Sequence, residues 1–214
     1  MSTATTVFIV DDDPSVLRAL ARLLRTEGLE VQCFGSSQAF LDQHDPEIPG
    51  CVVLDVAMPG LDGLDLQQTL AGQGAVRPIV FLSGQGDIPI SVRAMKAGAI
   101  DFLTKPVNGK DLVAAIHRAA DIDRRRRQEQ AELQRIMQRV ATLTPREREV
   151  LQHVVAGQLN KQIAADLGTV EKTIKVHRSR VMGKMGTRSI VELVRMTQRA
   201  GMSIESSRAS TPAP

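Results

Sequence analysis

The 214-residue chain contains no tryptophan and no tyrosine, and aromatic residues make up only 2% of it. Proteins that bind single-stranded nucleic acid without sequence preference stack its bases on aromatic side chains. The composition therefore argues against that mode of binding. With so few rings available, the hydrophobic core must be built mainly from Leu, Ile, Val, Ala and Met.

Cysteine is equally scarce, because Cys33 and Cys51 are the only two. Both lie in apolar, strand-like segments, so we expect buried, reduced thiols rather than a disulfide or a metal site. No apolar stretch approaches the roughly 20 residues that cross a membrane. The N-terminus also lacks the basic-then-apolar pattern of a secretory signal. We therefore expect a cytoplasmic protein with no membrane partner.

Positive and negative charges are unevenly distributed along the chain. Residues 1–120 contain 9 Lys and Arg against 14 Asp and Glu, whereas residues 121–214 contain 18 against 10. The resulting net charges of −5 and +8 add up to the +3 of the whole chain. An acidic half suits a metal ion and a basic half suits a polyanion, so we expect two domains with different partners.

Short apolar segments alternate with helical patterns along the acidic half. Continuous apolar runs are typical of strands that are buried on both faces of a parallel sheet. Strand–helix alternation favours a doubly wound α/β fold. We therefore predict a (βα)5 domain over residues 5–122. Its predicted strands are residues 7–10, 31–34, 51–54, 79–82 and 101–104.

Polar residues end four of these predicted strands. Asp11 and Asp12 follow the first strand, and Asp55 follows the third. Ser83 follows the fourth strand and Lys105 the fifth. The carboxyl ends of parallel strands lie on one edge of the sheet, where ligands bind. We therefore expect carboxylates, a hydroxyl and an amine to share one site.

This set of groups favours phosphoryl transfer to a carboxylate. Such transfer depends on positioning and charge neutralisation, which Mg²⁺ supplies when carboxylates hold it. We predict that Asp12, Asp55 and the backbone carbonyl of Ala57 bind Mg²⁺, and that Asp11 holds a metal-bound water. Asp55 is the predicted phosphoryl acceptor. The Ser83 hydroxyl and the Lys105 ammonium are expected to bind the phosphoryl oxygens.

Residues 10–14, 54–63, 82–84 and 105–106 carry the motifs of this site, and they resemble the receiver domain of two-component response regulators. The resemblance covers about residues 5–122. Residues 84–99 look most like the FixJ and StyR subgroup.

The resemblance implies that a sensor histidine kinase donates the phosphoryl group to Asp55. It also implies a switch in which Ser83 moves toward the phosphate and the ring of Phe102 turns inward. Phe102 stands where Tyr is frequent, so this ring has no hydroxyl to bond a partner. A receiver acts only on its own phosphorylation and slow dephosphorylation, so the resemblance does not imply an enzyme with a separate substrate.

The last helix of the first domain has no stop signal, and we predict a helical linker over residues 123–139. The linker begins with the arginine run 124–127, which we interpret as a solvated helix face. A contact with the DNA backbone or with a second chain is the alternative. Apolar residues with helical spacing follow the run; they are Leu133, Ile136, Met137 and Val140.

We predict a small all-α domain over residues 140–202. Thr144 begins its first helix with a capping box that includes Glu147. Asn160 is expected to cap the second helix, and Thr169 to cap a third that runs to about Lys184. Residues 203–214 are rich in Ser, Ala and Pro, and we expect a disordered tail.

A basic helix that directly follows a short helix and a turn is the usual reader of the DNA major groove. Residues 143–147, 160–164 and 173–178 resemble the LuxR-type helix-turn-helix, over about residues 140–202. The resemblance implies base contacts near Lys175, Val176 and Ser179. The expected phosphate contacts are Lys161, Lys172, Thr173, Arg178 and Arg180.

Together these features predict a response regulator that activates transcription. Phosphorylation of Asp55 is expected to change the surface near Phe102 and residues 88–97, so that two chains pair and read adjacent half-sites. The expected partners are a histidine kinase, double-stranded DNA, RNA polymerase and a second copy of the chain.

Two other functional hypotheses use the same residues. A Mg²⁺-dependent aspartyl-phosphatase of the haloacid-dehalogenase type also relies on Asp, Ser or Thr, and Lys. Such enzymes have an acid two residues after the nucleophile, where this chain has Ala57, and a cap insertion that is missing here. The other hypothesis is that the chain is a DNA-binding protein whose receiver domain serves only as a dimerisation scaffold. The intact Asp12, Asp55, Ser83 and Lys105 argue against it.

Overall fold

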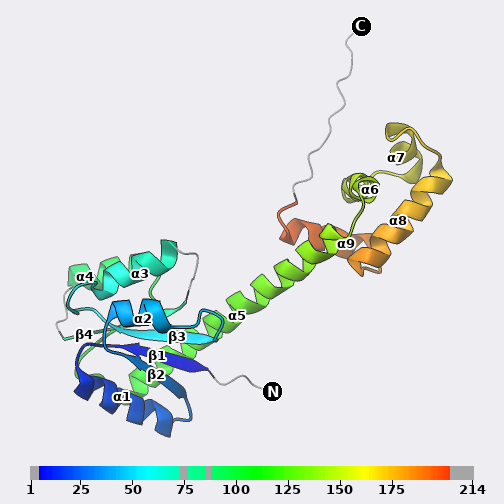
Figure 1. The fold of residues 1–214 in the computed structure, drawn as a ribbon. Helices are drawn as coiled ribbons and strands as arrows, with labels where there is room; N and C mark the ends of the chain where they lie inside the picture. The colour runs from blue at the N-terminus through cyan, green and yellow to red at the C-terminus, as the bar shows by residue number, and fades with distance from the viewer. Residues whose placement is uncertain (1–4, 73–76, 85–87, 203–214) are drawn as a thin grey trace. The chain divides into compact units, whose positions relative to one another are not determined.

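A computed structural model describes residues 5–72, 77–84 and 88–202. The chain forms two compact units, Met1–Arg127 and Gln128–Pro214 (Figure 1). The predicted disordered tail, residues 203–214, lies outside the described residues. In the described part, no helix combines the length and the apolar character needed to cross a membrane.

The first unit contains a five-stranded, wholly parallel sheet in the order β2-β1-β3-β4-β5. This order confirms the predicted doubly wound α/β fold. The strands lie close to their predicted positions and are β1 (Thr6–Val10), β2 (Glu30–Phe34), β3 (Gly50–Asp55), β4 (Ile79–Ser83) and β5 (Asp101–Thr104).

Helices cover both faces of the sheet because successive side chains of a strand point to opposite sides. In β1, Phe8 and Val10 belong to the core under α2, α3 and α4, while Val7 and Ile9 belong to the core under α1 and α5. Figure 1 shows α2, α3 and α4 on one side of the sheet and α1 on the other. The helices of this unit are α1 (Pro14–Thr26), α2 (Ser37–Gln43), α3 (Gly63–Gly72), α4 (Ile88–Lys96) and α5 (Gly109–Ala141).

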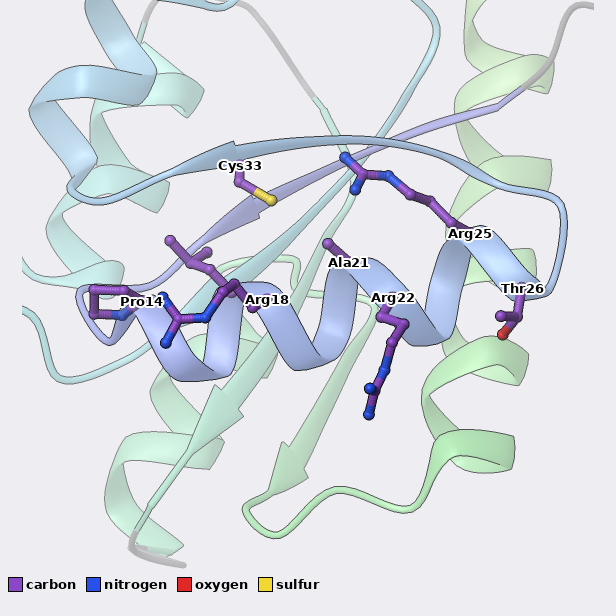
Figure 2. A pocket seen from close by; sticks show the side chains of 8 residues that line it. Pro14, Arg18, Ala21, Arg22, Arg25, Thr26 and Cys33 are labelled. Carbon is purple, nitrogen blue, oxygen red and sulfur yellow. The ribbon is translucent and has the colours of Figure 1, made fainter.

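Of the two cysteines, only Cys51 is buried as expected. Cys33 is exposed, which corrects the prediction. It lies on β2, an edge strand, which has a neighbouring strand on one side only. Figure 2 shows its sulfur above α1, in a groove of about 610 Å³ that Arg18 and Arg25 also line.

Helix α5 is a single helix that continues from the first unit into the second. The predicted apolar stripe along it divides into two parts. Ile136 is buried in the core of the second unit and Val140 packs against that core. Leu133 and Met137 are exposed. Much of the predicted linker therefore belongs to a folded unit.

Arg127 is an exception to the predicted solvated arginine face. Its guanidinium donates to the carbonyls of Pro46, Glu47 and Ile48 at 2.8, 3.1 and 3.2 Å. Its Nε also donates to Asp123 at 3.0 Å. The last arginine of the run therefore ties α5 to the loop before β3.

The second unit is a helical domain whose helices pack around one core. Its first helix begins with the predicted capping box of Thr144 and Glu147. The other two predicted caps are wrong, because the N-cap residues are Leu159 and Val170 and neither side chain can accept a hydrogen bond. The helices are α6 (Pro145–Val155), α7 (Asn160–Asp166), α8 (Glu171–Met185) and α9 (Ile190–Arg199).

Candidate functional site

The strand register brings the predicted site residues of the receiver to one edge of the sheet. Val10 pairs with Leu54, so Asp11, which follows β1, and Asp55, the last residue of β3, lie at the same level of two adjacent strands. Ser83 pairs with Thr104, and Lys105 comes next on the chain. The parallel arrangement thus gathers residues that are far apart in the sequence.

Lys105 connects two carboxylates of this edge. Its Nζ lies 2.7 Å from Oδ2 of Asp11 and 2.8 Å from Oδ1 of Asp55. The side chains of Asp11 and Asp55 are 1% and 6% exposed, so both carboxylates are shielded from water, while the side chain of Lys105 is 25% exposed. The second oxygen of Asp11 accepts from the backbone N–H of Asp13 at 2.9 Å.

The carboxylates of Asp11, Asp12 and Asp55 form a group that suits a divalent cation. One oxygen from each lies within 4.8 Å of the others. Carboxylate oxygens are the ligands that Mg²⁺ prefers, and the single ammonium of Lys105 leaves the cluster with negative charge for a cation to neutralise. Ala57 is exposed in the loop after β3, and its carbonyl as a metal ligand stays a prediction.

The site changes the pKa of Asp55 and of Lys105. Burial raises the pKa of Asp55, the charges of Asp11 and Asp12 add to this, and Lys105 opposes it. Burial disfavours the charged form of Lys105, but its hydrogen bonds to Asp11 and Asp55 outweigh this effect and raise its pKa. The cation of Lys105 thus keeps two close carboxylates compatible with one another.

Of the two predicted switch residues, Ser83 ends its strand at this edge, and Phe102 lies two residues before the end of β5. Ser83 is buried at the end of β4, and its carbonyl accepts from the backbone N–H of Lys105 at 2.7 Å. Phe102 is half-buried in β5, with its ring centroid 6.2 Å from that of Phe81. Ser83 therefore ends the strand that pairs with Asp55, and Phe102 lies on the strand that leads to Lys105.

Gly63 supports Asp55 in a way that the motif alone did not reveal. A Cβ at this position would lie 2.3 Å from the backbone oxygen of Asp55 and 3.1 Å from the ring of Phe81. The N–H of Gly63 also donates to the carbonyl of Val56 at 3.1 Å. Only glycine lets α3 begin so close to the end of β3.

The predicted DNA-contacting residues lie mainly on the exposed side of α8. Ile174, Val181 and Met185 face the core of the second unit, which leaves the opposite side of the helix in solvent. Lys161, at the start of α7, is exposed as well. The exposed predicted residues on α8 are Lys172, Lys175, Val176, Ser179 and Arg180.

The two remaining predicted contacts on α8, Thr173 and Arg178, are half-buried. The guanidinium of Arg178 donates to the side-chain oxygen of Asn160 at 2.8 Å and so links α8 to α7. Lys175 forms an ion pair with Glu171 one turn earlier, at 3.3 Å. This pair is exposed, so little free energy opposes its exchange for a phosphate or a base.

Lys184, near the end of α8, faces the protein. Its ammonium donates to Glu147 at 2.6 Å and to the carbonyl of Thr142 at 3.0 Å. The hydrogen bond from Lys184 and the backbone N–H of Thr144 lower the pKa of Glu147 to about 2. The capping box of α6 and the last turn of α8 therefore share one carboxylate.

Comparison with known proteins assigns both units. Residues 7–117 match the family model of the response regulator receiver domain, and residues 141–197 match that of bacterial regulatory proteins of the luxR family.

Similar proteins match nearly the whole chain. Nodulation protein W of Bradyrhizobium diazoefficiens is 46% identical over 94% of this chain and 89% of its own length. The transcriptional regulatory protein FixJ of the same organism is 43% identical over 94% of this chain and 98% of its own. The solved structure of the response regulator StyR is 45% identical, covers 92% of this chain and 99% of its own, and superposes with a TM-score of 0.84. The chain therefore belongs to the FixJ/NarL family of two-component response regulators, which join a receiver domain to a LuxR-type DNA-binding domain.

Proposed function

We propose that Asp55 accepts a phosphoryl group from a sensor histidine kinase in a Mg²⁺-dependent reaction. The observation that supports this most strongly is the position of Lys105 between Asp11 and Asp55, at 2.7 and 2.8 Å. A carboxylate oxygen of Asp55 forms the new bond to phosphorus while the bond to the donor group breaks. The reaction modifies the protein itself, so no separate substrate is converted.

Asp12, Asp55 and the carbonyl of Ala57 would hold the Mg²⁺ ion, and Asp11 would hold a water bound to it. When bound, the ion neutralises charge on the phosphoryl oxygens. Lys105 is placed to neutralise another oxygen of the product, and the Ser83 hydroxyl to donate a hydrogen bond to it. The added negative charge at Asp55 would then be sensed by Ser83 and by the ring of Phe102.

Acetyl phosphate tests this proposal, because it donates a phosphoryl group without a kinase. With Mg²⁺, the intact protein should gain one phosphoryl group by mass spectrometry, and removal of Mg²⁺ by a chelator should prevent this. Asp55→Asn should abolish the modification. Asp65→Asn, which changes an exposed acid on α3, should leave it unchanged. A phosphoryl group on another residue would refute the assignment.

We also propose that phosphorylation pairs two chains and so promotes sequence-specific binding to double-stranded DNA, from which the protein activates transcription by RNA polymerase in the cytoplasm. The exposed apolar residues of α4 support the pairing. Ile88, Val92 and Met95 recur at helical spacing, and all are at least 45% exposed. Sedimentation of the phosphorylated protein should reveal a dimer, and equal sedimentation of both forms would exclude this step.

A further inference from the structure

The C-terminal end of α8 is held by a residue of α5. The guanidinium of Arg139 donates to the carbonyl of Met185, the last residue of α8, at 2.9 Å. The last carbonyls of a helix have no partner within the helix. A positive charge at this end also interacts favourably with the helix dipole. Arg139 therefore acts as a C-terminal cap that comes from outside the helix.

Gly186 provides the space for this contact. It follows α8 in a left-handed conformation, with φ of 66°. A Cβ at this position would lie 3.2 Å from Nη1 and 3.3 Å from Cζ of Arg139. The missing side chain thus lets the guanidinium lie directly against the backbone that ends the helix.

Further contacts hold the same end of α8. Lys184 donates to the carbonyl of Thr142 and to Glu147. Ile136 of α5 and Met185 of α8 are 3% and 0% exposed and belong to the same core. The last turn of α8 therefore cannot move without breaking polar and apolar contacts with residues 136–147.

We propose that Arg139 is a positioning residue for DNA recognition, which sets the direction in which α8 presents Lys175 and Ser179. This inference rests on the proposed role of α8 as the reading helix. Along α8, Lys175 and Ser179 lie about 15 Å and about 9 Å from Met185, so a tilt of about 10° about that end moves them by about 2.6 Å and about 1.6 Å. Base-edge hydrogen bonds do not tolerate such a shift, whereas sequence-independent contacts with phosphates do.

The test compares two duplexes of equal length in binding assays with the phosphorylated full-length protein. One is a genomic fragment selected by the wild-type protein, and the other has a random sequence. Arg139→Ala should weaken binding to the selected fragment about tenfold, which corresponds to about 1.4 kcal/mol, and binding to the random duplex less than about twofold. Arg139→Lys should recover part of the preference, because an ammonium can also donate to the Met185 carbonyl.

Arg135→Ala is the matched control. It removes the same charge from the same helix one turn earlier, at an exposed arginine for which the described residues show no hydrogen bond or ion pair, and it should leave both affinities unchanged. Equal losses on both duplexes in Arg139→Ala would overturn the inference, because they would indicate a phosphate contact. The inference would also be overturned if no Arg139 variant changed the ratio of the affinities for the selected and the random duplex.

Two further measurements separate other causes. Circular dichroism shows whether Arg139→Ala is folded at the assay temperature. If it is unfolded, the inference is judged from Arg139→Lys and Arg139→Gln, by the ratio of their affinities for the selected and the random duplex. Lys175→Ala is measured in parallel. If Lys175→Ala loses the preference and Arg139→Ala keeps it, only the positioning role fails. If Lys175→Ala keeps the full preference, the proposed reading role of α8 fails.

Discussion

The ammonium of Lys105 lies 2.8 Å from the carboxylate of Asp55, and the same ammonium lies 2.7 Å from Asp11. A cation from the end of β5 thus joins the proposed nucleophile at the end of β3 to the carboxylate after β1. Two carboxylates this close repel one another, and a cation between them offsets the repulsion. Lys105 therefore performs part of the neutralisation that a bound metal ion would otherwise supply.

Lys105→Met should consequently increase the affinity for Mg²⁺. Without the ammonium the three carboxylates attract a cation more strongly, and the expected gain is about fivefold, or about 1 kcal/mol. Isothermal titration calorimetry is the suitable measurement, because the chain has no Trp or Tyr to report binding by fluorescence. Lys110→Met, at an exposed position of α5, should change nothing. Weaker Mg²⁺ binding in Lys105→Met would show that Lys105 instead organises the carboxylates for the metal.

Two arginines of one run should differ in their effect on stability. Arg127→Ala removes the hydrogen bonds to three backbone carbonyls and to Asp123, so it should lower the free energy of unfolding by about 2 kcal/mol. Arg125→Ala, at an exposed position, should stay within about 0.5 kcal/mol of the wild type. Urea titration followed by circular dichroism measures both. Similar values for the two variants would mean that the Arg127 contacts contribute nothing net.

A serine at the N-cap of α8 should stabilise the second unit. Val170 occupies this position with φ of −98° and ψ of 151°, an extended conformation that serine adopts readily. Val170→Ser supplies an oxygen for a free N–H of the first turn, and the expected gain is about 1 kcal/mol. Thermal unfolding compares it with Thr169→Ala, which should have little effect because Thr169 is not the cap. If Thr169→Ala lowers the stability by more than Val170→Ser raises it, Thr169 is the capping residue after all.

The stability of the second unit should depend on pH through Glu147. Its pKa is about 2 in the folded protein against an ordinary value of 4.5. Ionised Glu147 therefore stabilises the fold fully above pH 4.5, and this contribution is lost as the pH falls from 4.5 toward 2. Between pH 4.5 and pH 2, the free energy of unfolding should fall by less in Glu147→Gln than in the wild type. Parallel curves for the two proteins would exclude Glu147 as a source of the pH dependence.

Base and phosphate contacts on α8 should separate by mutation. Lys175→Ala should relax the sequence preference of DNA binding. Arg180→Ala should weaken binding to all duplexes about equally and reduce its salt dependence. Binding isotherms at several salt concentrations distinguish these effects. If both variants behave alike, the assignment of Lys175 to bases and Arg180 to phosphates is wrong.

The acidic site could be predicted because it depends on local patterns and one topological rule. Apolar runs end in Asp11, Asp55 and Ser83, and parallel strands place such ends on a common edge. The register in the structure shows this gathering for Asp11 and Asp55. The closeness of Gly63 to Asp55 was not visible in the sequence, because it depends on how tightly α3 begins against β3.

The sequence by itself determined the strand and helix order, the two-domain plan and the residues that end each strand, since these follow from periodicity and charge over short stretches. Only the tertiary structure decided which of several like residues has a partner. Arg127 binds a loop about 80 positions earlier, and Lys184, although exposed, forms an ion pair with the buried Glu147. Such choices depend on long-range packing, which places a donor beside an acceptor that no local pattern identifies.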